Sequence, residues 1–163
     1  MLGVSRMPCT RFAVDRMLGR LATWLRLIGQ DASYDAHLGT TALVRQASRE
    51  GRTILTRDRR LLHSPHHAAL LFIASDHFRD QLRQVVGHFH LDPCAQLCTR
   101  CARCNALVEG VGAATVADRV PPYVLATQPQ FVRCPRCNRV YWSATHCERI
   151  RAELAAMGLG PRH

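Results

Sequence analysis

The sequence predicts an α/β protein with a mostly parallel sheet, followed by a small cysteine-rich module. Two observations predict this organisation. Up to residue 92, short apolar and β-branched runs alternate with segments of helical periodicity, and from Asp92-Pro93 onward the chain becomes rich in Cys, Pro and Gly. Strands that alternate with helices are joined by right-handed crossovers, which is typical of parallel sheets. We therefore expect an α/β domain at 1–92 and a second module at 93–163.

Four short runs are candidate strands because they are apolar or rich in β-branched residues: 12–14, 32–34, 53–56 and 70–74. The run 70–74 is apolar throughout, which predicts a strand covered on both faces. Apolar residues at helical spacing predict four helices, each with a residue that caps or ends it. These helices cover 18–28 before Gly29, 43–47 between a Thr40 or Thr41 cap and Gly51, 82–89 after a Ser75 or Asp76 cap, and roughly 148–157 before Gly158.

The chain is strongly basic, with 22 arginines, no lysine and 12 acids, for a formal net charge of +10. Residues 1–92 hold 13 arginines against 8 acids and residues 93–163 hold 9 against 4, so each part carries +5. Such a charge favours polyanions, nucleic acid first, and a basic surface without a ligand is the alternative. The sequence has no apolar run long enough to span a membrane and no apolar signal-peptide core near Met1. We therefore expect a cytoplasmic protein whose thiols stay reduced.

Two Cys-x-x-Cys pairs, Cys101 with Cys104 and Cys134 with Cys137, are separated by 29 residues. Two such turns supply four soft thiolates in a closed tetrahedron, which predicts a structural zinc site of the zinc-ribbon type. An iron–sulfur cluster and unmetallated thiols are the alternatives. Cys98 lies three residues before Cys101, so the spacing also allows these two as the first pair. We interpret the remaining cysteines as ordinary thiols: Cys9, Cys94 and Cys147.

An acidic residue follows each predicted strand of the sheet: Asp15, Asp35, Asp58 and Asp76. The carboxyl ends of parallel strands form the ligand crevice of an open sheet, so we expect these carboxylates along one edge. In a protein of net charge +10, such a cluster predicts a Mg²⁺ or Mn²⁺ site that activates water for phosphodiester cleavage. Taken singly, Asp76 can be a helix cap and Asp58 a turn residue. Nearby arginines would hold the nucleic-acid backbone: Arg16, Arg20, Arg57, Arg59 and Arg60.

Motifs spread along the chain resemble those of one family: FAVDRMLGRLA at 12–22, WLRLIG at 24–29, Tyr34-Asp35, GRTILTRD at 51–58, Gln81-Leu82, RCARCN at 100–105, CPRC at 134–137, VYW at 140–142 and His146. From about residue 11 to 154, the chain resembles the mut-seven C-terminal RNase-like domain family, a PIN-like nuclease fold followed by a zinc ribbon. The resemblance implies an acidic site that cuts RNA with a divalent metal, in which Asp15 and Asp58 match the family's acids. It also favours Cys101 with Cys104, rather than Cys98 with Cys101, as the first zinc pair.

The sequence departs from the family pattern where the family usually places acids, at the start of the second helix. Here these positions hold Gly39-Thr40-Thr41-Ala42, and a hydroxyl does not replace an anionic metal ligand. Two ribbon positions also depart, with Ala144 where the family tends to have Gly and Cys147 where it tends to have an aromatic residue.

The favoured function is therefore a Mg²⁺- or Mn²⁺-dependent ribonuclease that also holds one structural zinc. Asp15 and Asp58 would be its principal metal ligands, with Asp35 and Asp76 in support. The missing acid at Thr40-Thr41 favours the alternative, a catalytically degenerate RNA-binding module associated with the ribosome or tRNA. A zinc-ribbon adaptor for other proteins is a third hypothesis, which the dispersed positive charge disfavours.

Overall fold

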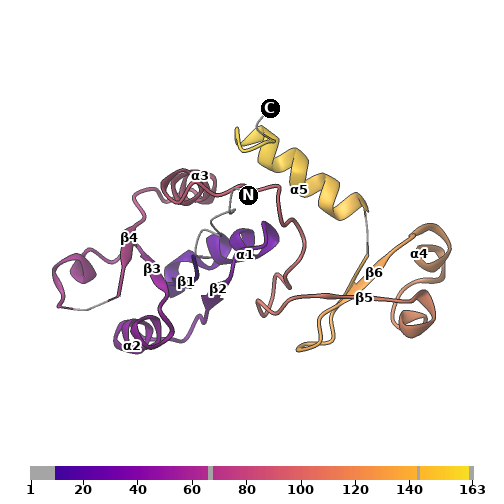
Figure 1. The fold of residues 1–163 in the computed structure, drawn as a ribbon, viewed down its shortest axis with the longest axis horizontal. Helices are drawn as coiled ribbons and strands as arrows, with labels where there is room; N and C mark the ends of the chain where they lie inside the picture. Colours follow the sequence, from indigo (N-terminus) through magenta and orange to yellow (C-terminus); the bar gives the residue numbers. More distant parts are fainter. Residues whose placement is uncertain (1–9, 66–67, 143, 162–163) are drawn as a thin grey trace, which may run out of the picture.

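The structure, a computed structural model, describes residues 10–65, 68–142 and 144–161 of the 163-residue chain (Figure 1). Four strands form a parallel sheet in the order β2-β1-β3-β4, and they cover Phe12–Val14 (β1), Ala32–Tyr34 (β2), Thr53–Thr56 (β3) and Leu70–Phe72 (β4). Phe12 is opposite Ala32 on one side and Thr53 on the other. The predicted α/β class with a parallel sheet is therefore confirmed.

Helices cover both faces of this sheet (Figure 1). α1 (Gly19–Leu27) and α3 (Phe78–His88) pack against each other on one face, and α2 (Thr40–Glu50) packs on β1 and β3 from the other. Short 3-10 helices follow two of the strands, η1 (Arg16–Leu18) after β1 and η2 (Arg59–His63) after β3. The two central strands are consequently enclosed between helical layers.

The helix boundaries correct two predicted caps. α2 begins at Thr40 with Gly39 as its N-cap, and α3 has His77 as its N-cap, with no side-chain cap at either start. Ser75 Oγ instead accepts the backbone N–H of His77 at 3.1 Å, so it closes the turn that precedes α3. The predicted end of α2 is confirmed, because Gly51 is in the left-handed region with φ of 61°.

β4 also differs from its prediction. It lies at the edge of the sheet, and all three of its residues are only partly buried. Leu71 packs against the core on one face of the sheet and Leu70 against the core on the other. The run is apolar because both faces touch helices, but in the described part of the chain no strand shields its outer edge.

The larger core lies beneath α1 and α3 and includes fully buried Phe12 and Leu82. The C-terminal helix α5 (Ala144–Ala156) returns to this core, where Ile150 and Leu154 are buried. Figure 1 shows α5 reaching back from the ribbon toward α1 and α3. A domain boundary at residue 92 therefore remains a prediction, because the last helix of the C-terminal part contributes to the core of the N-terminal part.

The C-terminal part contains a three-stranded antiparallel sheet, made of β5 (Glu109–Val111), β6 (Phe131–Arg133) and β7 (Val140–Trp142) in that order. Between β5 and β6 lie η3 (Ala113–Val116) and α4 (Pro122–Thr127). A small core joins them, made of Val116, Val120, Val124 and Phe131. No helix among the described residues is both long and apolar enough to cross a lipid bilayer.

The segment that connects the two parts lies against the end of α1. Gly29 has φ of 85°, and a Cβ at this position would collide with the backbone carbonyl of Gln96. The backbone N–H of Cys98 donates to the carbonyl of Leu27 at 2.8 Å. Glycine at position 29 thus permits both the left-handed turn after α1 and the close approach of the connection.

Candidate metal centre and acidic pocket

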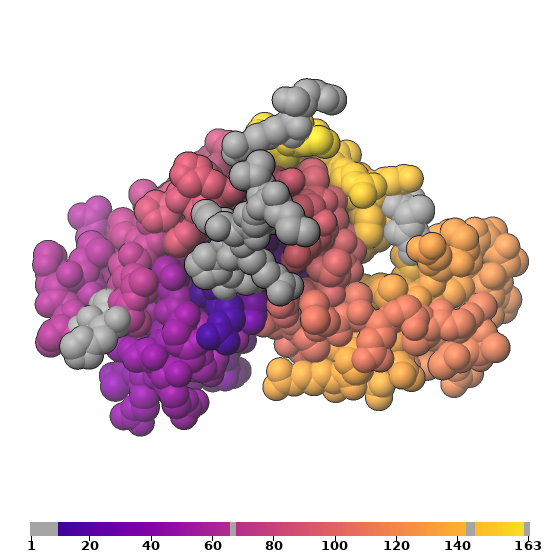
Figure 2. Space-filling view, in the orientation of Figure 1, coloured from indigo at the N-terminus to yellow at the C-terminus, as the bar shows by residue number. Residues whose placement is uncertain are grey.

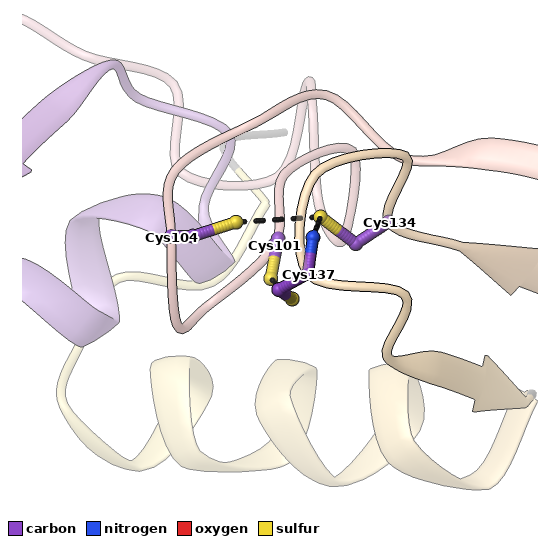
Figure 3. Close-up of side chains that lie close together, drawn as sticks. All are labelled: Cys101, Cys104, Cys134 and Cys137. Atoms are coloured by element: carbon purple, nitrogen blue, oxygen red, sulfur yellow. Dashed lines mark hydrogen bonds between the residues drawn. The ribbon is translucent and has the colours of Figure 1, made fainter.

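The side chains of Cys101, Cys104, Cys134 and Cys137 converge from two loops (Figure 3). Their four Sγ atoms all lie within 4.8 Å of one another, and the Sγ of Cys104 is 3.3 Å from that of Cys134. Cys101 and Cys134 are fully buried. Cys104 and Cys137 are partly exposed. A set of four soft sulfur ligands suits tetrahedral Zn²⁺ and leaves no open coordination position, so the cluster can hold a zinc ion in a structural role.

The two loops are built alike. In the first, the N–H of Asn105 donates to the carbonyl of Cys101 at 2.9 Å, and in the second the N–H of Asn138 donates to that of Cys134 at 2.9 Å. Both asparagines adopt positive φ, 70° and 58°. Asparagine tolerates the left-handed region, which turns the chain sharply after the second cysteine of each pair. The repeated motif Cys-x-Arg-Cys-Asn therefore produces the same turn twice.

The electrostatic environment of the cluster differs between its thiols. Burial acts to raise the pKa of Cys101, but hydrogen bonds from the Tyr141 hydroxyl and from the backbone of Cys104 and Arg103 outweigh it and lower that pKa to about 6. Burial raises the pKa of Cys104 to about 12, with further contributions from the neighbouring thiols. The Tyr141 Oη lies 3.0 Å from the Cys101 Sγ, and sequence reasoning missed this contact because the two residues are 40 apart in the chain.

Arg26 links the loop of Cys101 and Cys104 to the α/β part by hydrogen bonds. Its side chain is almost fully buried, with 4% exposed, and its Nε donates to the carbonyl of Ala32 at 2.8 Å. Its Nη1 donates to the carbonyls of Ala102 and Arg103 at 3.1 and 2.8 Å. The sequence signal was an arginine directly after Leu25 on the buried side of α1, where the pattern would otherwise place an apolar residue.

Cys98 is not part of the four-cysteine cluster. It forms a disulfide with Cys147, which brings the start of α5 against the connecting segment. The expectation of reduced, ordinary thiols is therefore wrong for Cys147, and 49 residues of sequence separate it from its partner. Cys94 has a free thiol, and Cys9 lies outside the described residues.

A second site lies at the carboxyl ends of β1 and β3. From these central strands the sheet continues to β2 on one side and to β4 on the other, and a crevice at such a point is the usual ligand site of an open α/β sheet. Asp15 and Asp58 line one pocket here, with a volume of about 240 Å³. The other lining residues are Arg16, Met17, Thr40, Arg57, Arg59 and Arg60.

A buried hydroxyl links the two acids. Thr56 Oγ1 donates to Asp15 Oδ2 at 2.5 Å and accepts the backbone N–H of Asp58 at 3.0 Å. Asp15 is 7% exposed and Thr56 is fully buried, so the Asp15 carboxylate is held in one orientation. Sequence reasoning did not identify Thr56 as a site residue. A polar residue at the end of an apolar strand is the feature that could have indicated it.

Asp58 is paired with an arginine of the same pocket. Arg60 donates to both carboxylate oxygens of Asp58, with Nη2 at 2.7 Å from Oδ2 and Nε at 2.9 Å from Oδ1. These hydrogen bonds lower the pKa of Asp58, and the backbone N–H of Arg60 adds to the effect. The Arg60 side chain is 88% exposed, whereas that of Asp58 is 13% exposed.

The other predicted acids lie outside the pocket. Asp76 forms an ion pair with Arg57 and is 79% exposed, and Asp35 accepts the backbone N–H of His37 at 2.8 Å. Among the described residues the four cysteines form a group of possible metal ligands, whereas the four acids do not. Of the predicted arginines, Arg20 also lies elsewhere, with its guanidinium 3.8 Å from the centre of the Phe78 ring. The structure thus brings Asp15 and Asp58 together, but not Asp35 and Asp76.

Comparison with known proteins places the whole arrangement in one family. The family model described as the Mut7-C RNAse domain matches residues 10–154, which include the parallel sheet, both cysteine pairs and most of α5. No curated protein and no solved structure gives a significant match. The match covers most of the chain, and the chain therefore belongs to the Mut7-C RNAse domain family.

Proposed function

We propose that the protein is a ribonuclease that hydrolyses RNA phosphodiester bonds at the pocket containing Asp15 and Asp58, with Mg²⁺ or Mn²⁺ as cofactor. The observation that carries this proposal is that two carboxylates and four arginines line one pocket at the central crevice of the sheet. Membership of an RNAse domain family supports RNA as the substrate. The net charge of +10 supports the same class of partner.

The donor set of the pocket fits a divalent cation. Mg²⁺ is usually bound through one or two carboxylates together with substrate phosphates, and Asp15 and Asp58 supply two hard oxygen ligands in one cavity. The bound cation would lower the pKa of a water nucleophile and offset the charge that develops on the phosphate. Thr56 would hold the Asp15 carboxylate in position by donating to its Oδ2 at 2.5 Å.

The arginines of the pocket would bind and orient the RNA backbone. Arg57 is suited to this role because its buried Nε has no hydrogen-bond partner among the described residues, while its Nη1 is held by Asp76. Asp76 would therefore support the site by orienting Arg57, and we assign no ligand role to Asp35. Guanidinium groups match phosphate geometry well because they can donate two parallel hydrogen bonds.

The zinc assignment is part of the same proposal. One Zn²⁺ bound by the four clustered cysteines would stabilise the C-terminal part, which has only a small core of its own. Its binding free energy would then be part of the folding free energy.

An assay with matched variants tests the catalytic assignment. Wild type should cut a mixed single-stranded RNA with Mn²⁺ and leave it intact with Ca²⁺, while Asp15→Asn and Asp58→Asn should each lose activity by about 10³-fold, since a lost metal ligand costs several kcal/mol. Mn²⁺ titration by electron paramagnetic resonance should show weaker binding in both variants. Asp118→Asn removes an exposed carboxylate of the C-terminal part and serves as the control. Equal cleavage by all four proteins would refute the assignment.

The alternative function is RNA binding without cleavage, in association with the ribosome or tRNA. One observation favours it: Thr40 lines the pocket and belongs to the segment Gly39-Thr40-Thr41-Ala42, where the family usually places acids, so the described residues bring two carboxylates to the pocket. In that case wild type binds RNA but does not cut it, whichever divalent metal is added. Thr40→Asp then becomes the informative variant, because cleavage gained by it would show that the missing carboxylate had silenced the site.

A further inference from the structure

A large polar cleft separates the α/β part from the two cysteine loops. Its volume is about 700 Å³, and β2 and α2 line one side while both loops line the other. Figure 2 shows the two parts as neighbouring lobes of the molecule. Four arginines and two acids line the cleft, which gives it a net positive charge: Arg26, Arg52, Arg103, Arg136, Asp35 and Glu50.

Neighbouring residues of the chain line the cleft and the acidic pocket. Val14 lines the cleft and the next residue, Asp15, lines the pocket. Likewise Thr40, at the start of α2, lines the pocket, and Glu50, at its end, lines the cleft. An 11-residue helix is about 16 Å long at 1.5 Å per residue. A chain that leaves the pocket can therefore follow α2 along the cleft to the cysteine loops.

Two arginines of the cleft have no side-chain partner among the residues that the structure describes. Arg52 is held by Asp31 and Glu50, with ion-pair distances of 2.6 and 2.5 Å. By contrast, the side chains of Arg103 and Arg136 are exposed and form no hydrogen bond or ion pair within the described part of the chain. Each occupies the same position in its loop, between the two cysteines of a pair, so the repeated turn presents both to one cleft.

We propose that this cleft binds the single-stranded RNA that extends from the acidic pocket, with Arg103 and Arg136 contacting its phosphates. The inference rests on the proposed function and adds a second contact region to it. Unpaired guanidinium groups in a positively charged cleft recognise phosphates, and backbone contacts of this kind are independent of base sequence. The cysteine cluster thereby gains a role in recognition, because it fixes the two loops that carry these arginines.

The first test removes arginine charges from the cleft and measures the affinity for RNA. Arg103→Gln with Arg136→Gln should weaken binding of a labelled single-stranded RNA by about 25-fold at 0.1 M salt, and should reduce the salt slope by about 1.4, since each single-strand phosphate contact contributes about 0.7. Ca²⁺ replaces Mn²⁺ so that the RNA stays intact. Arg149→Gln with Arg151→Gln removes two exposed charges from α5, outside the cleft, and should change affinity much less. The Arg→Lys pair at 103 and 136 keeps both charges and should retain most of the affinity.

The second test uses the wild-type protein, so it does not depend on how a variant folds. Phenylglyoxal modifies accessible arginines, and mass spectrometry with and without RNA should show protection of Arg103 and Arg136 but not of Arg149. If bound RNA leaves Arg103 and Arg136 unprotected, or if the Gln pair binds as well as the α5 control, the cleft inference is overturned while the ribonuclease proposal stands. Protection by polyglutamate but not by RNA would assign the cleft to an acidic protein and also overturn it. A wild type that neither binds nor cuts RNA would remove the proposed function itself.

Discussion

Arg26 offers the most direct test of how the two parts of the chain are joined. Arg26 is 4% exposed, and its guanidinium donates to three backbone carbonyls, that of Ala32 at the start of β2 and two in the first cysteine loop. Burial lowers the pKa of Arg26, although nearby Cys101, Cys104 and Asp31 oppose that effect. Arg26→Met keeps an unbranched side chain of similar reach but removes all three hydrogen bonds.

The cost of Arg26→Met follows from what it leaves behind. A buried carbonyl without its donor costs about 1–3 kcal/mol, and Arg26→Met leaves three carbonyls without theirs. Part of this loss is offset because a charge no longer has to be buried. We therefore expect a loss of about 3–5 kcal/mol in the free energy of unfolding, which is a large fraction of the ~5–15 kcal/mol typical of a domain.

Urea unfolding followed by circular dichroism measures this loss, and transfer of zinc to a chromophoric chelator measures the stability of the cysteine cluster. Arg26→Met should release zinc faster than wild type, because the loop that carries Cys101 and Cys104 loses its attachment to α1. Arg45→Met is the matched control, since Arg45 is an exposed residue of α2 and its substitution should cost less than about 0.5 kcal/mol. A loss below about 1 kcal/mol with unchanged zinc release would refute the reasoning.

Three further predictions concern other parts of the molecule. Cys134→Ser should lower bound zinc from about one per chain to near zero and expose the C-terminal part to proteases, whereas a stable, zinc-free wild type would contradict the zinc proposal. Gly29→Ala should lower the free energy of unfolding by about 2–4 kcal/mol in thermal denaturation, because it adds left-handed strain and an overlap with a backbone carbonyl. Gly110→Ala is its control, since a Cβ at this exposed position of β5 meets nothing. Although burial opposes it, hydrogen bonding to Arg52 holds the pKa of Asp31 below its ordinary value, so the stabilisation is present above about pH 4 and is lost as the pH falls through the folded-state pKa. Asp31→Asn should therefore be less stable than wild type at pH 7, and that difference should shrink on acidification; a constant difference would count against the ion pair.

The elements of the sheet were predictable because each has a strong local signal. Residues 12–14 and 53–56 combine β-branched or aromatic residues with burial at the sheet centre, where only Thr53 is partly exposed, and both are strands at the predicted positions. The caps of α2 and α3 were not predictable from propensity, because a threonine or serine near a helix start can equally enter the helix or close the preceding turn. The edge position of β4 was also not predictable from its apolar sequence, since its residues contact the cores on both faces of the sheet as those of a central strand would.

The cluster of four cysteines was predictable to the residue, whereas the acidic pocket was predictable only in part. The Cys-x-x-Cys spacing constrains two ligands to one turn, and the resemblance excluded Cys98, which the structure places in a disulfide. For the four acids, the sequence shows only that each one follows a predicted strand. Strand order decides which acids meet, and β2 and β4 lie at opposite edges of the sheet, so Asp35 and Asp76 are carried away from the central pair.

The pair formed by Asp58 and Arg60 decides how the proposed site would bind its cofactor. Asp15 is buried and fixed by Thr56, whereas Asp58 is engaged by an arginine that is 88% exposed. Exposed ion pairs are weak, so a phosphate can draw Arg60 away at little cost, and the Asp58 carboxylate then becomes available to a cation. RNA and Mn²⁺ should consequently bind with positive coupling, each strengthening the other by the same factor. Arg60→Gln should bind Mn²⁺ more tightly than wild type without RNA and should show a smaller gain when RNA is added. If Arg60→Gln and wild type bind Mn²⁺ equally in both conditions, Arg60 does not compete for Asp58.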